Sequence, residues 1–270
     1  YTVDDGRTPE YYLYQPDEPV TPLAPGTDPH EMAIEDAWPA VARLSVDVEG
    51  YALHGFDPSF RDFADASAIA RHYYPQVVDF VRRHTGAARV VVFDHTLRRR
   101  MPDDLAAQTS SQRNAVHLVH SDYTVASGPQ RVRELMGGEA DALLARRVAF
   151  YNVWKPLTAP VEELPLALCD ARSHVEADLL RMVLRYPDRN GEIYVMRHSP
   201  RHRWQYFPRM GPDQALLLKT YDSMTDGRAR FRAGNDHASG VHRLHGEREQ
   251  ICGPRRHFLL PRAGGPDRHD

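Results

Sequence analysis

The chain has 270 residues, of which 41% are hydrophobic and 26% are charged, and its formal net charge is −3. A chain of this length and composition can bury a sizeable core and is typical of a globular domain. The nearly balanced charge gives no general attraction to nucleic acid or to an anionic membrane surface. No apolar run of about 18 residues predicts a membrane span. We therefore expect neither nucleic acid nor a membrane as a partner, and the oligomeric state is left open.

The two cysteines, Cys169 and Cys252, are too few for a disulfide framework. Their scarcity favours a reducing compartment, and we expect a cytoplasmic protein. Because the chain begins with Tyr1 rather than Met, we also expect the natural protein to begin earlier, so the lack of a signal peptide carries little weight.

Residues 1–40 are rich in Pro, Asp and Glu, and their seven prolines argue against a helix or a central strand. We predict an extended arm here, with a disordered leader as the alternative, and a single domain over residues 41–270. Residues 42–53 alternate as in a strand or hairpin broken at Gly50. Residues 65–84 carry the apolar stripe of a helix that ends at Thr85-Gly86, and residues 89–93 form a candidate buried strand.

A strand over residues 115–120 is followed by Gly128-Pro129, which predicts a break, and by a helix over 131–144 that is interrupted at Gly137-Gly138. Further strands are predicted over residues 147–154, 166–171, 192–197, 203–207 and 215–221. Short β-rich runs separated by Pro and Gly are typical of an antiparallel barrel or sandwich. With its helices concentrated upstream, the sequence predicts a mainly β fold with buttressing helices.

The end of the strand over 115–120 carries the sequence His120-Ser121-Asp122. Side chains two apart on a strand project to the same face, so an imidazole and a carboxylate converge there. With a second histidine from a distant strand, such a pair forms the two-histidine, one-carboxylate site of non-heme Fe(II) oxygenases. A His-x-Asp pair on its own is weak evidence, because a surface pair or a buried core histidine is the commoner explanation.

Several motifs along the chain resemble the hydroxylase/desaturase family of secondary metabolism, which includes AsaB-like and CmcJ-like proteins. They are VVFDHTLRRR, VHSDYT, SGPQRV, FYNVWKPL and HRWQYFPRMGPDQALLLKTYDS, and the likeness runs from about Val41 to Arg248. That family belongs to the Fe(II)/2-oxoglutarate-dependent oxygenases. The resemblance implies a double-stranded β-helix (jelly-roll) core, His120 and Asp122 as two iron ligands, and Fe(II), 2-oxoglutarate and O2 as metal and cosubstrates.

The resemblance also implies a second histidine soon after Arg230-Phe231, and here His237, His242 and His245 compete for that role. Related oxygenases place an arginine about ten residues beyond the last histidine, where its guanidinium binds the far carboxylate of 2-oxoglutarate through two charge-assisted bonds. The family has a sequence like Arg-Glu-Ser-Ile at this point, and this chain has Arg248-Glu249-Gln250-Ile251. Counting back from Arg248 selects His237 as the third ligand. The tail after Ile251 diverges from the family.

Four further residues are expected at the cosubstrate site, with core packing as the alternative. Tyr123 and Thr124 directly follow the ligand pair, and Asn152 and Lys155 lie in the family motif FYNVWKPL. Lys219 and Asp222 are expected either to form a structural ion pair or to lie at the mouth of the site.

The predicted activity is hydroxylation or desaturation of a small natural-product intermediate, coupled to decarboxylation of 2-oxoglutarate. Two alternatives stay open. One is a metal-dependent hydrolase, because a His-Asp-His set can also hold Zn²⁺ with an open water position. The other is a non-catalytic family member that has lost iron through its altered C-terminal region.

Overall fold

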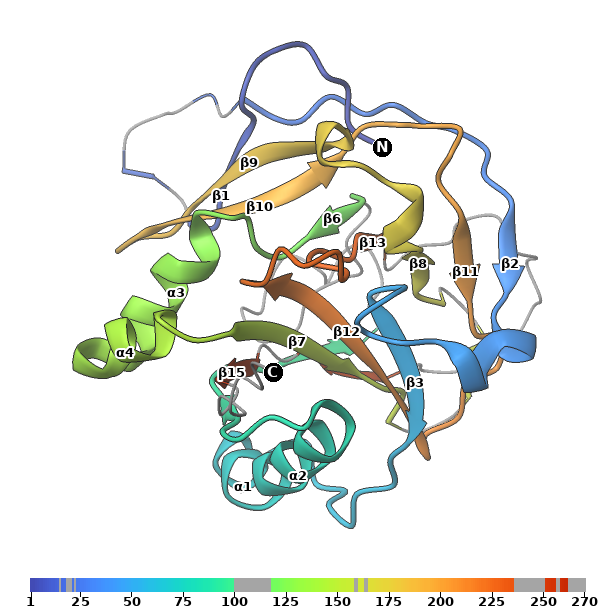
Figure 1. The fold of residues 1–270 in the computed structure, drawn as a ribbon, viewed down its shortest axis with the longest axis vertical. Helices are drawn as coiled ribbons and strands as arrows, with labels where there is room; N and C mark the ends of the chain where they lie inside the picture. The colour runs from blue at the N-terminus through green and yellow to red at the C-terminus, as the bar shows by residue number, and fades with distance from the viewer. Residues whose placement is uncertain are drawn as a thin grey trace, which may run out of the picture.

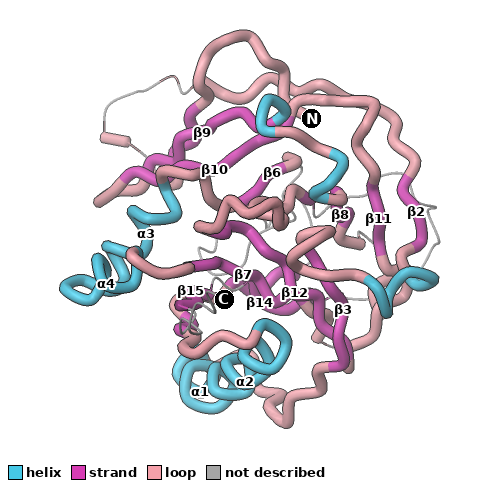
Figure 2. The backbone as a smooth tube through the Cα atoms, in the orientation of Figure 1, coloured by secondary structure: helices cyan, strands magenta, loops and turns pink. Residues whose placement is uncertain are grey.

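The computed structural model describes residues 1–14, 16–17, 21, 23–99, 118–157, 160–162, 165–235, 251–255 and 258–261. Its main feature is a pair of β-sheets with helices around the outside, as Figures 1 and 2 show. The α-helices are α1 (Ala66–Ala68), α2 (Tyr74–Thr85), α3 (Ser127–Met136) and α4 (Ala140–Leu144). Short helical turns are η1 (Trp38–Arg43), η2 (Ile69–Tyr73), η3 (Gly137–Glu139), η4 (Ala171–Ser173) and η5 (Glu176–Asp178).

The larger sheet has eight strands in the order β1-β9-β10-β6-β13-β8-β11-β2. They are β1 (Glu10–Tyr12), β2 (Ile34–Asp36), β6 (His120–Ser121), β8 (Ala167–Cys169), β9 (Leu179–Arg185), β10 (Asn190–Met196), β11 (Trp204–Tyr206) and β13 (Gly234–Asn235). The inner pairings are antiparallel, whereas β1 and β2 pair in parallel with β9 and β11 at the two edges. Both edge strands come from residues 1–40, so this arm runs along both sides of the sheet.

The smaller sheet has five strands in the order β3-β12-β7-β15-β4. They are β3 (Tyr51–Gly55), β4 (Val91–Val92), β7 (Val148–Trp154), β12 (Gln214–Asp222) and β15 (Phe258–Pro261), and β5 (Thr96–Arg99) pairs separately with β14 (Ile251–Arg255). The register between β12 and β7 shifts between Lys219 and Tyr221, which marks Thr220 as a β-bulge.

Helix α2 covers the outer face of the five-stranded sheet, at the bottom of Figure 1. The segment starts at Asp65, whose carboxylate accepts hydrogen bonds from the backbone N–H groups of Ser67 and Ala68. It ends at Gly86, which adopts φ 67°, a left-handed conformation that glycine reaches without strain. Its buried Val77, Phe80 and Val81 pack against Tyr151, Val153 and Leu217 of the sheet.

The inner faces of the two sheets enclose a second cluster, in which Trp154, Leu216 and Leu218 of the smaller sheet pack with Leu168 of the larger one. Because Tyr151 and Val153 face α2 and Trp154 faces inward, Asn152 also faces inward. At one end, Val132 of α3 and Ala140 of α4 pack on aromatic residues that include Phe150 and Tyr221.

The N-terminal arm covers the outer face of the eight-stranded sheet. Tyr1, Met32 and Ile34 pack against a cluster on this face that contains Val119 and Trp204. The indole N–H of Trp204 donates to the hydroxyl of Tyr1 at 2.7 Å. Each sheet is therefore shielded from solvent on its outer side, one by a helix and the other by extended chain.

Most predicted elements are confirmed, including the helix over 65–84 and the strands over 147–154, 192–197 and 215–221. Three expectations differ from the structure. Only Tyr51–Gly55 of the predicted hairpin is a strand, because the carbonyl of Ser45 accepts from the N–H groups of Val48, Glu49 and Gly50 in a tight turn. Strand β9, LLRMVLR, was not predicted, because its apolar residues do not alternate with polar ones.

The third difference is at Gly128-Pro129, which lies inside the first turn of α3 rather than in a break before it. Proline is tolerated there because the first N–H groups of a helix have no intrahelical acceptor. The predicted central strand over 115–120 is described only from residue 118, and its strand residues are His120–Ser121. In the part of the chain that the structure describes, no helix combines the length and apolar character that crossing a membrane requires.

Candidate metal centre

His120 and Asp122 lie in the middle of the larger sheet, where β6 is hydrogen-bonded between β10 and β13. His120 lies beside Asp122, whose carboxylate bonds to Asn152 of the opposite sheet, so the pair faces the space between the sheets. The side chain of His120 is 7% exposed and that of Asp122 is 16% exposed. The pair is therefore largely enclosed by the sandwich.

The imidazole of His120 is oriented by a backbone carbonyl. Its Nδ1 lies 2.7 Å from the carbonyl oxygen of Leu118, and since that oxygen can only accept, Nδ1 donates. In the neutral ring the other nitrogen, Nε2, then carries the lone pair that a metal ion needs. The sequence could not reveal this contact, because a backbone carbonyl carries no side-chain signal.

The lone pair of His120 and the carboxylate of Asp122 converge on one point. Nε2 of His120 is 3.5 Å from Oδ1 of Asp122, which is longer than the usual N–H···O hydrogen bond of about 2.7–3.2 Å. Two atoms that each bind one metal ion at about 2 Å lie at most about 4 Å apart. The separation therefore fits two ligands of a single ion, and imidazole and carboxylate are donors that suit iron.

The rest of the predicted ligand set lies outside the described residues. Within the described ranges, no group of three His, Cys, Asp or Glu side chains is placed to hold a metal ion. The predicted third ligand His237, the alternatives His242 and His245, and the predicted cosubstrate-binding Arg248 all fall between residues 236 and 250. Their roles stay predictions.

Asn152 of β7 bonds directly to the carboxylate of the pair. Its Nδ2 donates to Oδ2 of Asp122 at 2.6 Å, and the residue is 1% exposed. No residue that the structure describes donates to its other polar atom, Oδ1. A buried amide oxygen without a donor costs about 1–3 kcal/mol, so a ligand that donates to Oδ1 would stabilise the site.

Tyr123 and Thr124 are both buried, and their contacts are with neighbouring structure. The ring of Tyr123 stacks on Phe150 with the ring centroids 4.4 Å apart, and burial raises the pKa of its phenol above the usual range. The hydroxyl of Thr124 accepts from the backbone N–H of Ser127 at 3.0 Å and donates to Glu192 at 3.1 Å. These contacts join the start of α3 to β10.

Lys155 follows β7 directly and is 3% exposed. Its Nζ donates to the carbonyl oxygen of Phe56 at 3.0 Å and lies 5.2 Å from the centre of the Phe56 ring. Burial lowers the pKa of Lys155 to about 8. The structure thus joins Lys155 to the end of β3, whereas Asn152 on the same stretch of chain reaches Asp122.

Arg232 is a buried cation near the pair that the sequence did not single out. It is 3% exposed, and it lies two residues before Gly234, the residue directly opposite His120 in the β6–β13 register. A side chain at position 234 would collide with the guanidinium of Arg232. A larger residue beside His120 would therefore force the Arg232 side chain to move.

Lys219 and Asp222 form the structural ion pair that was one of their two expected roles. Both are fully buried, with Lys219 Nζ 2.9 Å from Asp222 Oδ2, and Arg147 and Asp47 extend the network. Burial acts to raise the pKa of the Asp47 carboxyl, but its hydrogen bond to Lys219 and nearby arginines hold that pKa below its usual value. The charges of Lys219 and Asp222 are thus compensated by each other and by Arg147 and Asp47.

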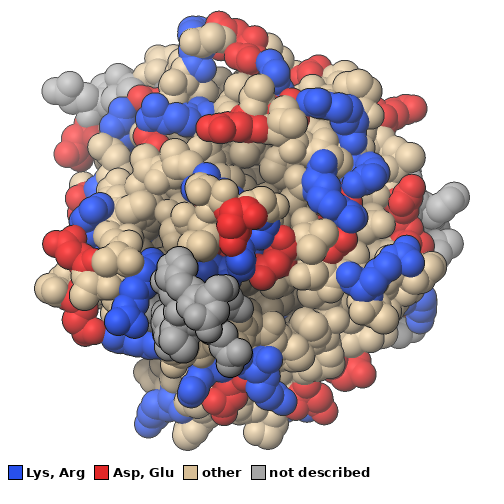
Figure 3. All heavy atoms as spheres, in the orientation of Figure 1, with Lys and Arg blue, Asp and Glu red and all other residues tan. Residues whose placement is uncertain are grey.

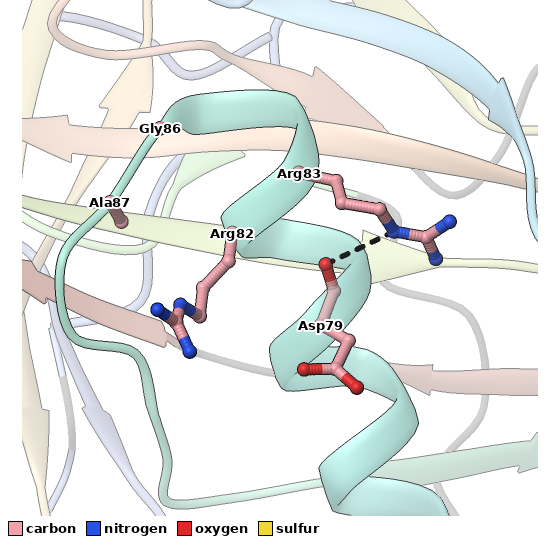
Figure 4. Close-up of a pocket in the computed structure, with 5 residues that line it drawn as sticks. All are labelled: Asp79, Arg82, Arg83, Gly86 and Ala87. Carbon is pink, nitrogen blue, oxygen red and sulfur yellow. Dashed lines mark hydrogen bonds between the residues drawn. The ribbon is translucent and has the colours of Figure 1, made fainter.

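Figures 3 and 4 show how charged side chains are distributed on one face of the molecule and around one surface hollow. On the face in Figure 3, acidic and basic side chains are interspersed rather than gathered by sign. The hollow in Figure 4 lies beside the C-terminal end of α2 and is lined by Asp79, Arg82, Arg83, Gly86 and Ala87. Arg83 there bonds to the backbone oxygen of Asp79.

Known proteins resemble the chain in both sequence and fold. The family described as "Oxidoreductase/YMDC permease-like domain" matches residues 1–242. The hydroxylase/desaturase efuI of Hormonema carpetanum is 30% identical over 208 residues, which are 69% of this chain and 70% of that protein. The alpha-ketoglutarate-dependent dioxygenase phiK of a fungal species (strain ATCC 74256) is 28% identical over 184 residues, 66% of each chain. The chain thus spans about two thirds of the length of these two relatives.

A solved structure of the iron and alpha-ketoglutarate-dependent endoperoxidase NvfI has the same fold. It superposes with a TM-score of 0.83 at 23% identity, over 95% of this chain and 94% of that one. The predicted mainly β fold with buttressing helices and a double-stranded β-helix core is confirmed. An imidazole and a carboxylate that converge between the two sheets are compatible with a non-heme iron site.

The chain belongs to the hydroxylase/desaturase family of iron- and 2-oxoglutarate-dependent dioxygenases. This membership favours an oxygenase over the metal-dependent hydrolase that the sequence left open. Its cofactors are accordingly Fe(II) and 2-oxoglutarate, and its substrates are O2 and a small molecule.

The buried ion network predicts a large difference between two aspartates. Removing one partner of a buried pair leaves the other charge uncompensated, so Asp222→Asn should lower the free energy of unfolding by about 3–5 kcal/mol. Asp226→Asn is the matched control, because Asp226 pairs with Arg228 at the surface and exposed pairs contribute about 0–1 kcal/mol. Urea unfolding measures both, and equal losses would contradict a structural role for the Lys219–Asp222 pair.

Proposed function

We propose that the chain hydroxylates or desaturates a small natural-product intermediate, with iron held by His120, Asp122 and His237. The observation that carries this proposal is the convergence of His120 Nε2 and Asp122 Oδ1 at 3.5 Å inside the sandwich. When bound with 2-oxoglutarate, iron supplies the oxidation of an unactivated C–H bond by O2, coupled to decarboxylation of the cosubstrate. The name of the relative efuI, a hydroxylase/desaturase, supports this type of reaction.

The protein's own residues orient the iron ligands and bind the cosubstrate and the substrate. The Leu118 carbonyl keeps the proton on Nδ1 of His120, so that Nε2 stays available as a ligand. Arg248 binds the distal carboxylate of 2-oxoglutarate through its planar guanidinium. Asn152 can accept one hydrogen bond at Oδ1 from a hydroxyl or amide of the substrate or from water, whereas 2-oxoglutarate carries only acceptor oxygens. Its place at the cosubstrate site stays a proposal that rests on the family motif.

Two observations support His237 over the other histidines. The family match ends at residue 242, so His245 lies beyond it. Asn235, the last described residue before His237, belongs to β13, which is hydrogen-bonded to the strand of His120. In the sequence His237 follows Asn235 by two residues, whereas His242 follows it by seven.

The remaining predictions are kept as proposals. Tyr123, Thr124 and Lys155 are candidates for contact with the cosubstrate, although their packing against Phe150, Ser127 and Phe56 supports a structural role. We take residues 41–270 as one oxygenase domain with a divergent tail, preceded by the arm of residues 1–40. A cytoplasmic location is supported by Cys169, which is a free, buried thiol. Nucleic acid is not a proposed partner, because the net charge is slightly negative.

The first test is Asp122→Ala, which should abolish iron retention and turnover while the protein stays folded. The change removes the carboxylate that lies beside Nε2 of His120. Asp141→Ala is the control, because that side chain is 95% exposed and far less constrained. Anaerobic titration with Fe(II) and 2-oxoglutarate, followed by the weak visible absorption of the bound cosubstrate, measures retention. Iron bound equally well by Asp122→Ala would exclude the assignment, and a wild-type chain that binds no iron would favour a non-catalytic member.

The second test compares the three histidines beyond β13. His237→Ala should remove iron, whereas His242→Ala and His245→Ala should retain it, because one imidazole completes the ligand set. Metal content of the three purified variants decides the question. Full iron occupancy in His237→Ala would move the third ligand to one of the other two positions.

The third test concerns the cosubstrate. Arg248→Lys keeps the charge but loses the planar pair of donors, so 2-oxoglutarate binding should weaken by roughly 1.5–3 kcal/mol, or about 10- to 150-fold. Arg243→Lys serves as the control. The dependence of succinate formation on 2-oxoglutarate concentration measures the effect, and an unchanged dependence in Arg248→Lys would assign the role to another cation.

A further inference from the structure

The contact between Asn152 and Asp122 joins the two sheets of the sandwich. Asn152 belongs to β7 of the five-stranded sheet, and Asp122 follows β6 of the eight-stranded sheet. Nδ2 of Asn152 donates to Oδ2 of Asp122 at 2.6 Å. The carboxylate is thus fixed from the opposite wall of the site.

The two oxygens of Asp122 have different neighbours. Oδ2 is engaged by Asn152, whereas Oδ1 faces Nε2 of His120 at 3.5 Å. A carboxylate held at one oxygen cannot rotate freely about its last bond, so the second oxygen is kept on the side of the imidazole. The hydrogen bond therefore selects which oxygen is available for a metal ion.

Asn152 is itself held firmly. Leu218 of β12 lies directly opposite it in the register, every residue of β7 is buried, and Asn152 is 1% exposed. The orientation of its amide is also determined, because turning it over would place Oδ1 against the carboxylate of Asp122. An aspartate here would oppose two negative charges, and a leucine of similar size would offer no donor.

We propose that Asn152 is the positioning residue of the metal centre, which holds Oδ2 of Asp122 so that Oδ1 is presented beside His120 Nε2. This inference rests on the proposed role of Asp122 as a ligand. It predicts that Asn152 contributes to metal affinity although it does not bind the metal. Groups that orient a metal ligand in this way typically change affinity by about 10- to 100-fold.

The test uses Co(II) as a probe, titrated anaerobically into the full chain and followed by its visible absorption. Asn152→Leu, which is similar in size but lacks the donor, should weaken Co(II) binding about 10- to 100-fold. Asn152→Ala should change it in the same direction and guards against a failure of the leucine variant to pack. Thr220→Val is the control, because it removes a different buried hydrogen-bond donor, the Thr220 hydroxyl on the neighbouring strand, which does not bond to Asp122.

The outcomes separate the two proposals. A purely structural role for Asn152 would lower the melting temperature of the metal-free protein and leave the Kd for Co(II) unchanged, and this result would overturn the inference. It would leave the ligand assignment intact provided that Asp122→Ala still loses Co(II). If Asp122→Ala binds Co(II) as tightly as the natural chain, the assignment of Asp122 as a ligand is itself wrong.

Discussion

Burial of strand β7 on both faces is the constraint on which the rest of the molecule depends. All seven of its residues are buried, with one set facing α2 and the other facing the opposite sheet. An inward polar residue on such a strand must find its partner across the sandwich. Asn152 bonds to Asp122. The position of this predicted ligand therefore depends on strand β7, whose other face packs against helix α2.

The arm of residues 1–40 covers the exposed edges of the eight-stranded sheet. An open sheet exposes unpaired N–H and C=O groups along its edges, which can recruit other chains. Here β1 and β2 occupy both edges of the eight-stranded sheet, while Tyr1, Met32 and Ile34 cover its outer face. The arm thus covers both edges and the outer face of the sheet that carries His120.

The sequence predicted features that depend on residues close together in the chain, but not contacts between residues far apart in it. The two-residue spacing of His120 and Asp122 predicted their convergence, and short β-rich runs bounded by Pro and Gly predicted β7 and β12. The bond from Asn152 to Asp122 joins residues thirty positions apart on different sheets, so no periodicity reveals it. The place of Arg232 against Gly234 depends on strand pairing. The predicted break at Gly128-Pro129 was wrong, because proline and glycine, which interrupt the middle of a helix, are tolerated in its first turn.

The bulge at Thr220 gives strand β12 one residue more than its neighbour over the same length. Lys219 and Asp222 lie opposite Tyr151 and Ala149, so both point to one face although they are three apart in sequence. The extra residue is excluded from the regular ladder, and its carbonyl accepts the hydroxyl of Ser121, between the two predicted ligands, at 3.3 Å. The bulge thus has two effects at once. It lets Lys219 and Asp222 share one face of β12, and it places a backbone carbonyl of β12 beside Ser121 of the strand that carries His120.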